Sequence, residues 1–447
     1  MIEYRNLRVA LLGAGSVGAQ VARLLLAHQD ELAARAGAGL ELVGIAVRDI
    51  DAPRTVDLPR ELFTTDAESL ILGADIVVEL MGGIEPARTL VLQALNSGAD
   101  VVTANKALIA THGPELSDAA EQVGAQLAYE AAVGGAIPII RPLRDSLAGD
   151  RVERILGIVN GTTNFVLDRM HTHGESLETA LAVASDLGYA EADPTADIEG
   201  YDAAQKAAIL AGLAFHTTVP IEQVYREGIT RVTKDEVDAA RESGHVIKLL
   251  AICERLTDPA TGAEGVSARV YPALVPAAHP LAAVRGAHNA VFVQASAAGD
   301  LMFYGAGAGG VETASAVLGD LVSVARRHVV GGPGVAESMH AHLPVLEIGR
   351  AVTRYQISLQ VVDQPGVLAR IARMLSDGGV SVEAVRQTIA SDPSESPAAG
   401  AAAPAATATL VIGTHPAPES ALAATVEALA QSDVVAAVTS VLRVEGS

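Results

Sequence analysis

A cluster of carboxylates followed by one lysine is the stretch of this chain best suited to chemistry. The carboxylates that precede Lys206 are Glu191, Asp193, Asp197, Glu199 and Asp202. The apolar run after Lys206, AAILAGLAF, predicts a helix that begins near Gly200. Residues four apart on a helix share one face, so Asp202 would lie beside Lys206. The loop carboxylates would hold a substrate ammonium while the lysine moves a proton; a solvated acidic loop with an ordinary ion pair is the alternative.

A glycine-rich turn near the N-terminus indicates a dinucleotide site. It follows the apolar run 7–12, precedes a segment of helical periodicity, and consists of Gly13, Ala14, Gly15, Ser16, Val17 and Gly18. The three glycines would allow a tight turn, a close approach of the pyrophosphate and close packing of the helix. A glycine-rich connection without a ligand is the alternative.

The end of the second predicted strand, 41–47, bears on the choice of cofactor. Arg48 and Asp49 follow this strand. An arginine here holds the 2′-phosphate of NADP, whereas an acid holds the ribose hydroxyl of NAD. Arg48 therefore favours NADP and Asp49 keeps NAD open, while a solvated charge pair explains both residues equally well.

Alternating strands and helices predict a Rossmann-type, doubly wound parallel sheet over residues 1–150. Further strands are predicted at 75–80, 100–104 and 126–133. Ligands bind at the carboxyl ends of such strands, where Lys106 would contact cofactor or substrate or simply begin a helix. The loop at Glu130 combines a carboxylate with backbone carbonyls and would suit a cation, although a turn before a helix explains it as well.

The pattern changes after residue 150. Strands predicted at 266–275, 289–295 and 300–304, mixed with helices, indicate an α+β domain over 151–310 whose sheet would bury against a second copy. A second glycine turn then opens a helix, 311–330, that would return to the nucleotide domain. A linker, 331–352, leads to a separate unit, 353–447, with a Pro/Ala/Ser-rich insertion at 391–408 that predicts a mobile connection.

Composition restricts the classes of function. The 447 residues include 53 acidic and 31 basic ones, a net charge of −22 that argues against nucleic acid and anionic membranes as partners. No apolar run of transmembrane length and no signal sequence is evident. Cys253 is the one cysteine, so no intrachain disulfide forms and a cytoplasmic location is expected. We predict that Cys253 is a buried residue of an apolar helix.

Together these segments resemble the homoserine dehydrogenases across essentially the whole chain. The resemblance is carried by GAGSVG, TANKALI, YEAAVGGAIPII, NGTTNF, GYAEADPTADIEGYDAAQKAAILA and GAGAGGVETASAVLGD. It implies NAD(P)-dependent interconversion of L-homoserine and L-aspartate 4-semialdehyde, on the route to threonine, methionine and isoleucine, by a homodimer or homotetramer. Unit 353–447 resembles an ACT domain, a ferredoxin-like βαββαβ fold whose 363–368 turn would bind L-threonine as a feedback inhibitor; a purely structural, dimerising role is the alternative.

The resemblance also implies roles for individual residues. Lys206 would be the proton donor and acceptor, with Asp202 and Lys106 beside it in catalysis. Substrate would be held by Glu191, Asp202, Gly188 and Lys106. Cofactor would be bound by Gly13, Ala14, Gly15, Ser16, Val17, Gly18, Arg48, Thr103, Lys106, Gly188, Glu191 and Gly307. A sodium ion would be bound, largely by backbone oxygens, at Glu130, Val133, Gly135 and Ile137.

In the expected reaction, a lysine takes the proton of the alcohol as a hydride leaves for the nicotinamide, and burial would lower the pKa of that lysine. A non-catalytic amino-acid sensor is disfavoured because Glu191, Asp202 and Lys206 occur together. Aspartate-semialdehyde dehydrogenase chemistry needs a reactive thiol, and Cys253 lies in an apolar segment. A fused aspartate kinase is not expected, since the first strand begins near residue 7.

Overall fold

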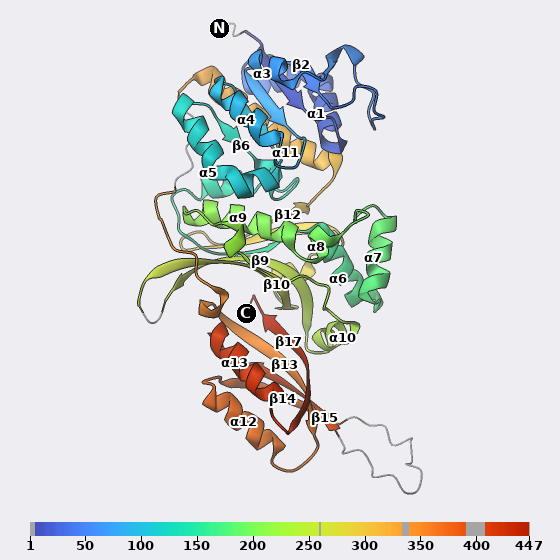
Figure 1. Ribbon diagram of the computed structural model, residues 1–447, viewed down its shortest axis with the longest axis vertical. Helices are drawn as coiled ribbons and strands as arrows, with labels where there is room; N and C mark the ends of the chain where they lie inside the picture. Colours follow the sequence, from blue (N-terminus) through green and yellow to red (C-terminus); the bar gives the residue numbers. More distant parts are fainter. Residues whose placement is uncertain (1–4, 259–260, 333–338, 390–406, 447) are drawn as a thin grey trace.

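The computed structural model describes residues 5–258, 261–332, 339–389 and 407–446. Three domains follow one another along the long axis of the molecule, and the C-terminal domain lies at the end opposite the N-terminal domain (Figure 1). Among the described residues, none of the helices is long and apolar enough to cross a lipid bilayer.

The N-terminal domain contains a six-stranded sheet in the order β3-β2-β1-β4-β5-β6, with every pair parallel. Its strands are β1 (Leu7–Leu12), β2 (Leu40–Ala46), β3 (Phe63–Thr64), β4 (Ile76–Glu79), β5 (Asp100–Thr103) and β6 (Leu127–Ala128). The predicted doubly wound sheet is confirmed. The strand predicted at 126–133 is only two residues long, because a 3₁₀ turn at Glu130–Ala132 ends the extended conformation.

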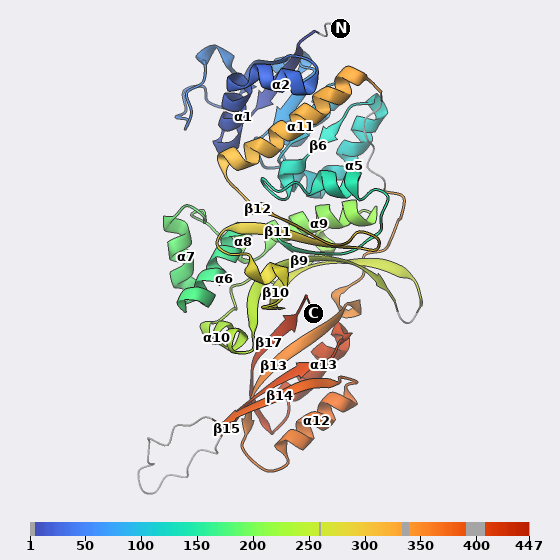
Figure 2. The same ribbon diagram turned by 180° about the vertical axis from the view of Figure 1, so that it is seen from behind.

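Helices cover both faces of this sheet because its strands are apolar on both sides. In β1, Val9 and Leu11 face one hydrophobic cluster, while Ala10 and Leu12 face the other. The helices are α1 (Ser16–Ala27), α2 (Gln29–Ala36), α3 (Ala67–Leu72), α4 (Ala87–Asn96), α5 (Lys106–Val123) and α11 (Gly310–Val330). Helix α11 packs on α1, so the chain returns to this domain after the central strands (Figure 2).

The central domain has an antiparallel sheet with the order β12-β11-β7-β9-β10. Its strands are β7 (Val152–Ile158), β9 (His245–Thr257), β10 (Glu264–Pro276), β11 (His288–Ala295) and β12 (Gly299–Ala306). Cys253 lies in β9, so its predicted helix is wrong, although its predicted burial is confirmed. The apolar run around Cys253 is paired on both edges, with β7 and β10, and such a fully buried strand cannot be told from a buried helix by periodicity.

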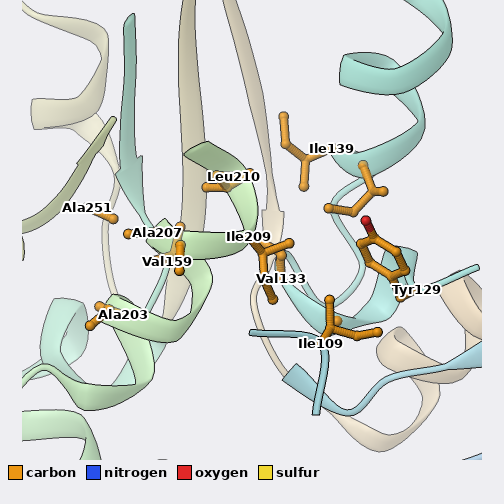
Figure 3. Packing of buried hydrophobic residues seen from close by; sticks show 14 of the residues in the cluster. Ile109, Tyr129, Val133, Ile139, Val159, Ala203, Ala207, Ile209, Leu210 and Ala251 are labelled. Atoms are coloured by element: carbon orange, nitrogen blue, oxygen red, sulfur yellow. The ribbon is translucent and has the colours of Figure 1, made fainter. Parts of the chain in front are cut away.

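Helices of the central domain lie at the face of the sheet toward the N-terminal domain or at its end (Figure 1). They are α6 (Gly161–His173), α7 (Leu177–Asp186), α8 (Thr195–Ile198), α9 (Tyr201–Phe215) and α10 (Lys234–Glu242). Helix α9 is almost entirely buried. Its Ala207 lies toward Ala251 of β9, while its Ile209 lies toward Val133 and Tyr129 of the N-terminal domain (Figure 3). The core therefore fixes α9 between the two domains.

The C-terminal domain has the βαββαβ order that the sequence predicts. Its elements are β13 (Val352–Val362), α12 (Val367–Asp377), β14 (Val382–Ile389), β15 (Thr407–Thr414), α13 (Glu419–Ala430) and β17 (Val435–Val444). Strand β17 also pairs with β10 of the central domain, through Ala273 with Arg443 and Leu274 with Val444. The sheet therefore continues between the two domains, which the sequence did not predict. Except for its last two residues, the predicted mobile connection 391–408 lies outside the described residues.

Candidate active site

The carboxylate of Asp202 lies between two lysines. Helix α9 begins after Gly200, whose φ of 80° is left-handed, and Asp202 is the second residue of the helix. Lys206 Nζ is 2.8 Å from Asp202 Oδ2, and Lys106 Nζ is 2.9 Å from Oδ1. Lys206 Nζ also donates to the carbonyl of Val159 at 2.6 Å. The pairing of Asp202 with Lys206 follows the predicted helical spacing, whereas Lys106 arrives from the other domain, at the start of α5.

Burial and charge act in opposite directions on these groups. Asp202 is 6% exposed, and burial by itself raises the pKa of its carboxyl, but the charges of Lys206 and Lys106 outweigh burial and hold that pKa far below its usual range. The pKa of Lys106 is raised, chiefly by the charge of Asp202. Asp202 is therefore ionised, and Lys106 carries its proton, at neutral pH.

Asn160 joins this cluster although sequence reasoning gave it no role. Its Nδ2 donates to Asp202 Oδ2 at 2.9 Å and to Asp197 Oδ1 at 2.7 Å. Asn160 is also the N-cap of α6, where its side chain accepts from the amide of Thr163. The available signal was the cap itself, since Asn followed by Gly-Thr-Thr is a common start of a helix.

A cavity of about 730 Å³ joins this cluster to the glycine turn of the N-terminal domain. The predicted site residues that line the cavity are Ser16, Val17, Lys106, Val133, Gly135, Gly188, Glu191, Asp202, Lys206 and Gly307. Predicted residues outside its lining are Gly13, Ala14, Gly15, Gly18, Arg48, Thr103, Glu130 and Ile137. The cavity is also lined by residues for which no role was predicted, among them Asn105, Asn160, Thr162 and Tyr189.

The glycine turn has the geometry that its spacing predicts. A Cβ on Gly13 would lie 2.7 Å from the carbonyl oxygen of Leu80, and a Cβ on Gly18 would lie 2.1 Å from that of Gly13. By contrast, no atom lies within 4 Å of the Cβ position of Gly15. The space beside Gly15, in front of the N-terminus of α1, therefore fits a pyrophosphate.

The second glycine turn packs just as closely against the site. A Cβ on Gly307 would lie 2.1 Å from Cγ of Asn289, and one on Gly135 would lie 2.3 Å from the carbonyl oxygen of Gly307. Asn289 is only 1% exposed, and neither polar atom of its amide has a hydrogen-bond partner among the described residues. Residue 307 must be glycine because the Asn289 amide packs directly against its backbone and occupies the position of a Cβ.

Two predicted cofactor residues have different surroundings. Arg48 is exposed at the end of β2, and no described residue forms a hydrogen bond with its side chain. The Thr103 hydroxyl is buried, donates to Glu79 at 2.6 Å and accepts from the amide of Asn105. Arg48 is therefore available to a ligand, whereas the side chain of Thr103 supports the loop before Lys106.

The carboxylate of Glu130 is not available as a cation ligand. Its oxygens accept hydrogen bonds from the amides of Ile139, Ile140 and Arg141 at 2.5 to 2.9 Å, and from Arg141 Nε at 2.9 Å. Any cation at this loop would have to use backbone carbonyls. Among the described residues, no three His, Cys, Asp or Glu side chains gather as a metal site.

Comparison with known proteins gives one consistent family. A model described as homoserine dehydrogenase matches residues 138–322, and one described as homoserine dehydrogenase, NAD binding domain matches residues 13–130. The chain is 54% identical to the homoserine dehydrogenase of Mycobacterium tuberculosis over 447 residues, covering 100% of this chain and 99% of the relative. It is 52% identical to that of Corynebacterium glutamicum over 439 residues, covering 98% and 95%.

Solved structures agree with this result. The crystal structure of a homoserine dehydrogenase from Thiobacillus denitrificans matches with a TM-score of 0.88 and 38% identity, covering 99% of this chain and 98% of the other. A hyperthermophilic archaeal homoserine dehydrogenase in complex with NADPH matches with a TM-score of 0.60 and 26% identity, covering 74% and 99%.

Proposed function

The chain belongs to the homoserine dehydrogenase family, and from that membership we propose how its own residues perform the reaction. It is an NAD(P)-dependent oxidoreductase that interconverts L-homoserine and L-aspartate 4-semialdehyde. The observation that carries the proposal is the position of Asp202 between Lys206 and Lys106 in a cavity shared with the glycine turn.

We assign proton transfer to Lys206. An ammonium group has three N–H donors. Two of those on Lys206 are directed to Asp202 and to the Val159 carbonyl, which leaves one for the substrate oxygen. In aldehyde reduction the ammonium gives a proton to the carbonyl oxygen, and in alcohol oxidation the neutral amine takes the hydroxyl proton. The nicotinamide cofactor, when bound, supplies or accepts the hydride. Lys106, more exposed and also paired with Asp202, would stabilise negative charge on the same oxygen.

We assign the substrate ammonium to Glu191. This carboxylate lines the cavity and is exposed, and no described residue forms a hydrogen bond with it. Asp202 lies in the same cavity and would complete the binding of the amino-acid substrate, with Gly188 in the turn after α7 leaving space for it.

The test is the rate of NADP⁺ reduction by L-homoserine. Lys206→Ala should lose about 10²-fold to 10⁴-fold in kcat, the usual contribution of a proton-transfer residue. Lys234→Ala is the matched control, because Lys234 also forms an i,i+4 pair with an aspartate, Asp238, but on the surface of α10. If Lys206→Ala kept most of its turnover, Lys206 would not be the proton donor. No turnover by the folded wild-type protein would favour the non-catalytic sensor.

We propose that the cofactor is NADP, held at the glycine turn and at Arg48, with NAD as the weaker alternative. The open space beside Gly15 supports this assignment, as does the exposed Arg48, which pairs with no residue in the described ranges. The related archaeal enzyme in complex with NADPH supports a nicotinamide cofactor at this fold.

We also propose a sodium ion, or a similar monovalent cation, at the loop of Glu130, Val133, Gly135 and Ile137. The carbonyls of Val133, Gly135 and Ile137 accept no backbone hydrogen bond from any described residue, and oxygen ligands suit such an ion. Binding would raise the melting temperature in NaCl above that in choline chloride at equal ionic strength. Equal melting temperatures would remove the ion from this loop.

For the C-terminal domain we propose an ACT-type regulatory role with L-threonine as the effector. The βαββαβ order supports it, as does the continuous sheet from β17 into β10. Inhibition by L-threonine but not by L-serine is the expected result; a domain that only dimerises would respond to neither. We further propose a homodimer or homotetramer in the cytoplasm, which light scattering and cell fractionation would test.

A further inference from the structure

The side-chain amide of Asn160 uses all of its hydrogen-bonding capacity, with different partners for its oxygen and its nitrogen. Its Oδ1 accepts from the amide of Thr163 at 2.9 Å and from the Thr163 hydroxyl at 2.9 Å. Its Nδ2 donates to Asp197 and to Asp202. Asn160 is 6% exposed, so water contributes little to this arrangement.

These partners fix the orientation of the amide. A backbone N–H can only donate, so the atom of Asn160 that faces Thr163 N must be the oxygen. The other two partners are the carboxylates of Asp197 and Asp202, and that of Asp202 is ionised throughout the neutral range. A carboxylate accepts hydrogen bonds, so the atom of Asn160 that faces these two must be the amide nitrogen. A flipped amide would place its nitrogen against the Thr163 amide and its oxygen against Asp197 and Asp202.

Asn160 differs from the other groups that hold Asp202. Lys206 shares Oδ2 with Asn160, and Lys106 holds Oδ1. A lysine that gives its proton to a substrate loses its charge, and with it most of its attraction for a carboxylate. Of the donors to Asp202 in the described part of the chain, Asn160 alone is neutral, so its hydrogen bond is unchanged at every stage of proton transfer.

Asn160 also holds two acidic segments together. Asp197 lies in α8 (Thr195–Ile198) and Asp202 in α9, and their like charges would repel without a donor between them. The same side chain anchors this pair to the first turn of α6, a 13-residue helix of the central domain.

We propose that Asn160 is a positioning residue of the reaction: it holds Asp202 in register with Lys206 and Lys106 while one lysine changes its protonation state. This proposal rests on the proposed function, in which Asp202 organises the two lysines. Asn160 touches neither substrate nor cofactor in this role. It acts through Asp202.

The first test is Asn160→Asp, because aspartate keeps the size and is an equally good N-cap for α6. The variant loses both N–H donors and adds a third carboxylate. We expect kcat for L-homoserine to fall by about 10-fold to 100-fold while the KM for the cofactor changes little. Protonation of the new carboxyl restores a donor, so the ratio of variant to wild-type kcat should rise as the pH falls from about 9 to about 6. Wild-type kcat throughout this pH range would overturn the proposal, and the further variants separate the lost donors from the added charge.

The second test separates the bond to Asp202 from the bond to Asp197. In the swap Asn160→Asp with Asp197→Asn, one carboxylate and one amide remain between positions 160 and 197, and net charge is unchanged. The donor to Asp202 is lost. We expect kcat to stay low in the swap, and recovery to the wild-type kcat would overturn the proposal.

Two further variants make the result independent of folding and of the proposed function. Asn160→Ser keeps a cap for α6 and adds no charge, but it removes the amide N–H donors and should therefore also lose kcat. Wild-type kcat in this variant would overturn the proposal even if Asn160→Asp failed to fold. Asp202→Asn reports on the premise. If Asp202→Asn keeps wild-type kcat, the proposed role of Asp202 fails; if it loses activity and the Asn160 variants do not, only the positioning role fails.

Discussion

The guanidinium of Arg443 lies 2.9 Å from the carboxylate of Glu227, and this contact joins the C-terminal domain to the central domain. Arg443 is in β17 and also lies 2.6 Å from Glu419 of α13. The residue before Glu227, Arg226, donates to the carbonyl of Glu199 and stacks on Tyr201 at the start of α9. The C-terminal strand is therefore two contacts away from the helix that carries Asp202.

Replacing Arg443 with methionine should destabilise the contact between these domains. The substitution removes the pair with Glu227 of the central domain. It also takes from Glu419 its one cationic partner in the described chain, and that side chain, which is 5% exposed, keeps the hydrogen bonds from Thr353 and Tyr355 alone, at a cost of about 3–5 kcal/mol. Urea unfolding would measure this loss as a lower midpoint or an earlier, separate transition. Arg370→Met is the matched control, since Arg370 pairs with Asp433 on the surface of the same domain. Equal stability of the two variants would contradict the prediction.

The free energy of unfolding should fall as the pH rises from about 4 to about 7, because Asp320 ionises at a lower pH in the unfolded chain than in the folded one. Burial raises the pKa of Asp320 to about 7. Between pH 4 and 7 the unfolded chain has lost this proton while the folded chain retains it, so the unfolded state binds fewer protons and stability declines with rising pH. Asp320→Asn can still accept the hydrogen bond from the Glu130 amide. The substitution should remove a decline on the order of 4 kcal/mol between about pH 4 and about pH 7.

The measurement is the free energy of unfolding of wild type and Asp320→Asn at several pH values from about 4 to about 8. The two curves should converge at the acidic end and separate at the alkaline end, with the variant more stable. Asp118→Asn, at an exposed position of α5, should follow the wild type throughout. Parallel curves for wild type and Asp320→Asn would mean that Asp320 does not titrate in this range.

Arg48 should decide the preference between cofactors. Its guanidinium is exposed and unpaired in the described structure, so a 2′-phosphate would gain a charge-assisted hydrogen bond there without breaking another. Arg48→Ala should raise the KM for NADP⁺ by about 10-fold and leave the KM for NAD⁺ nearly unchanged. Arg60→Ala, which removes another exposed arginine of the same domain, is the control. Equal effects on both cofactors would place the 2′-phosphate elsewhere.

Local patterns in the sequence predicted the elements that carry the site. The glycine turn before α1 and the start of α9 follow from short-range rules of spacing, and so does the pair of Asp202 and Lys206. What the sequence could not predict depends on contacts between distant residues. Asn160 meets Asp202 across 42 positions, and Lys106 meets it across domains. Pairing of β17 with β10 and the strand at Cys253 are likewise decided by neighbours that no local window contains.

Glu130 shows the same limit in another way. Its type and its loop suggested a carboxylate ligand, yet the fold places three backbone amides and the Arg141 guanidinium around that carboxylate. Hydrogen-bond donors that come from the backbone leave no signal in residue identity. Backbone oxygens of this loop were also expected to bind the ion, and the carbonyls of Val133, Gly135 and Ile137, which accept no backbone hydrogen bond from any described residue, are what supports the proposed cation.

The two glycines at the N-terminus of α1 should fail in opposite ways when each is replaced by alanine. At Gly18 a Cβ would lie 2.1 Å from the backbone oxygen of Gly13, and backbone atoms cannot move aside, so Gly18→Ala should lower the melting temperature. At Gly15 the Cβ would meet no atom within 4 Å, and the φ of −72° suits alanine, so Gly15→Ala should fold with wild-type stability. Its methyl group would instead occupy the space where the pyrophosphate approaches the backbone.

Gly15→Ala should therefore weaken NADPH binding by about 10-fold or more while its melting temperature without NADPH stays at the wild-type value. Fluorescence titration with NADPH and thermal unfolding of the same samples measure both quantities. Gly149→Ala is the control, because its Cβ position is also open and lies far along the chain from the turn. Because the fold of Gly15→Ala should be unchanged, any difference in affinity would come from the added methyl group. Wild-type affinity would therefore mean that the cofactor does not pass over this glycine.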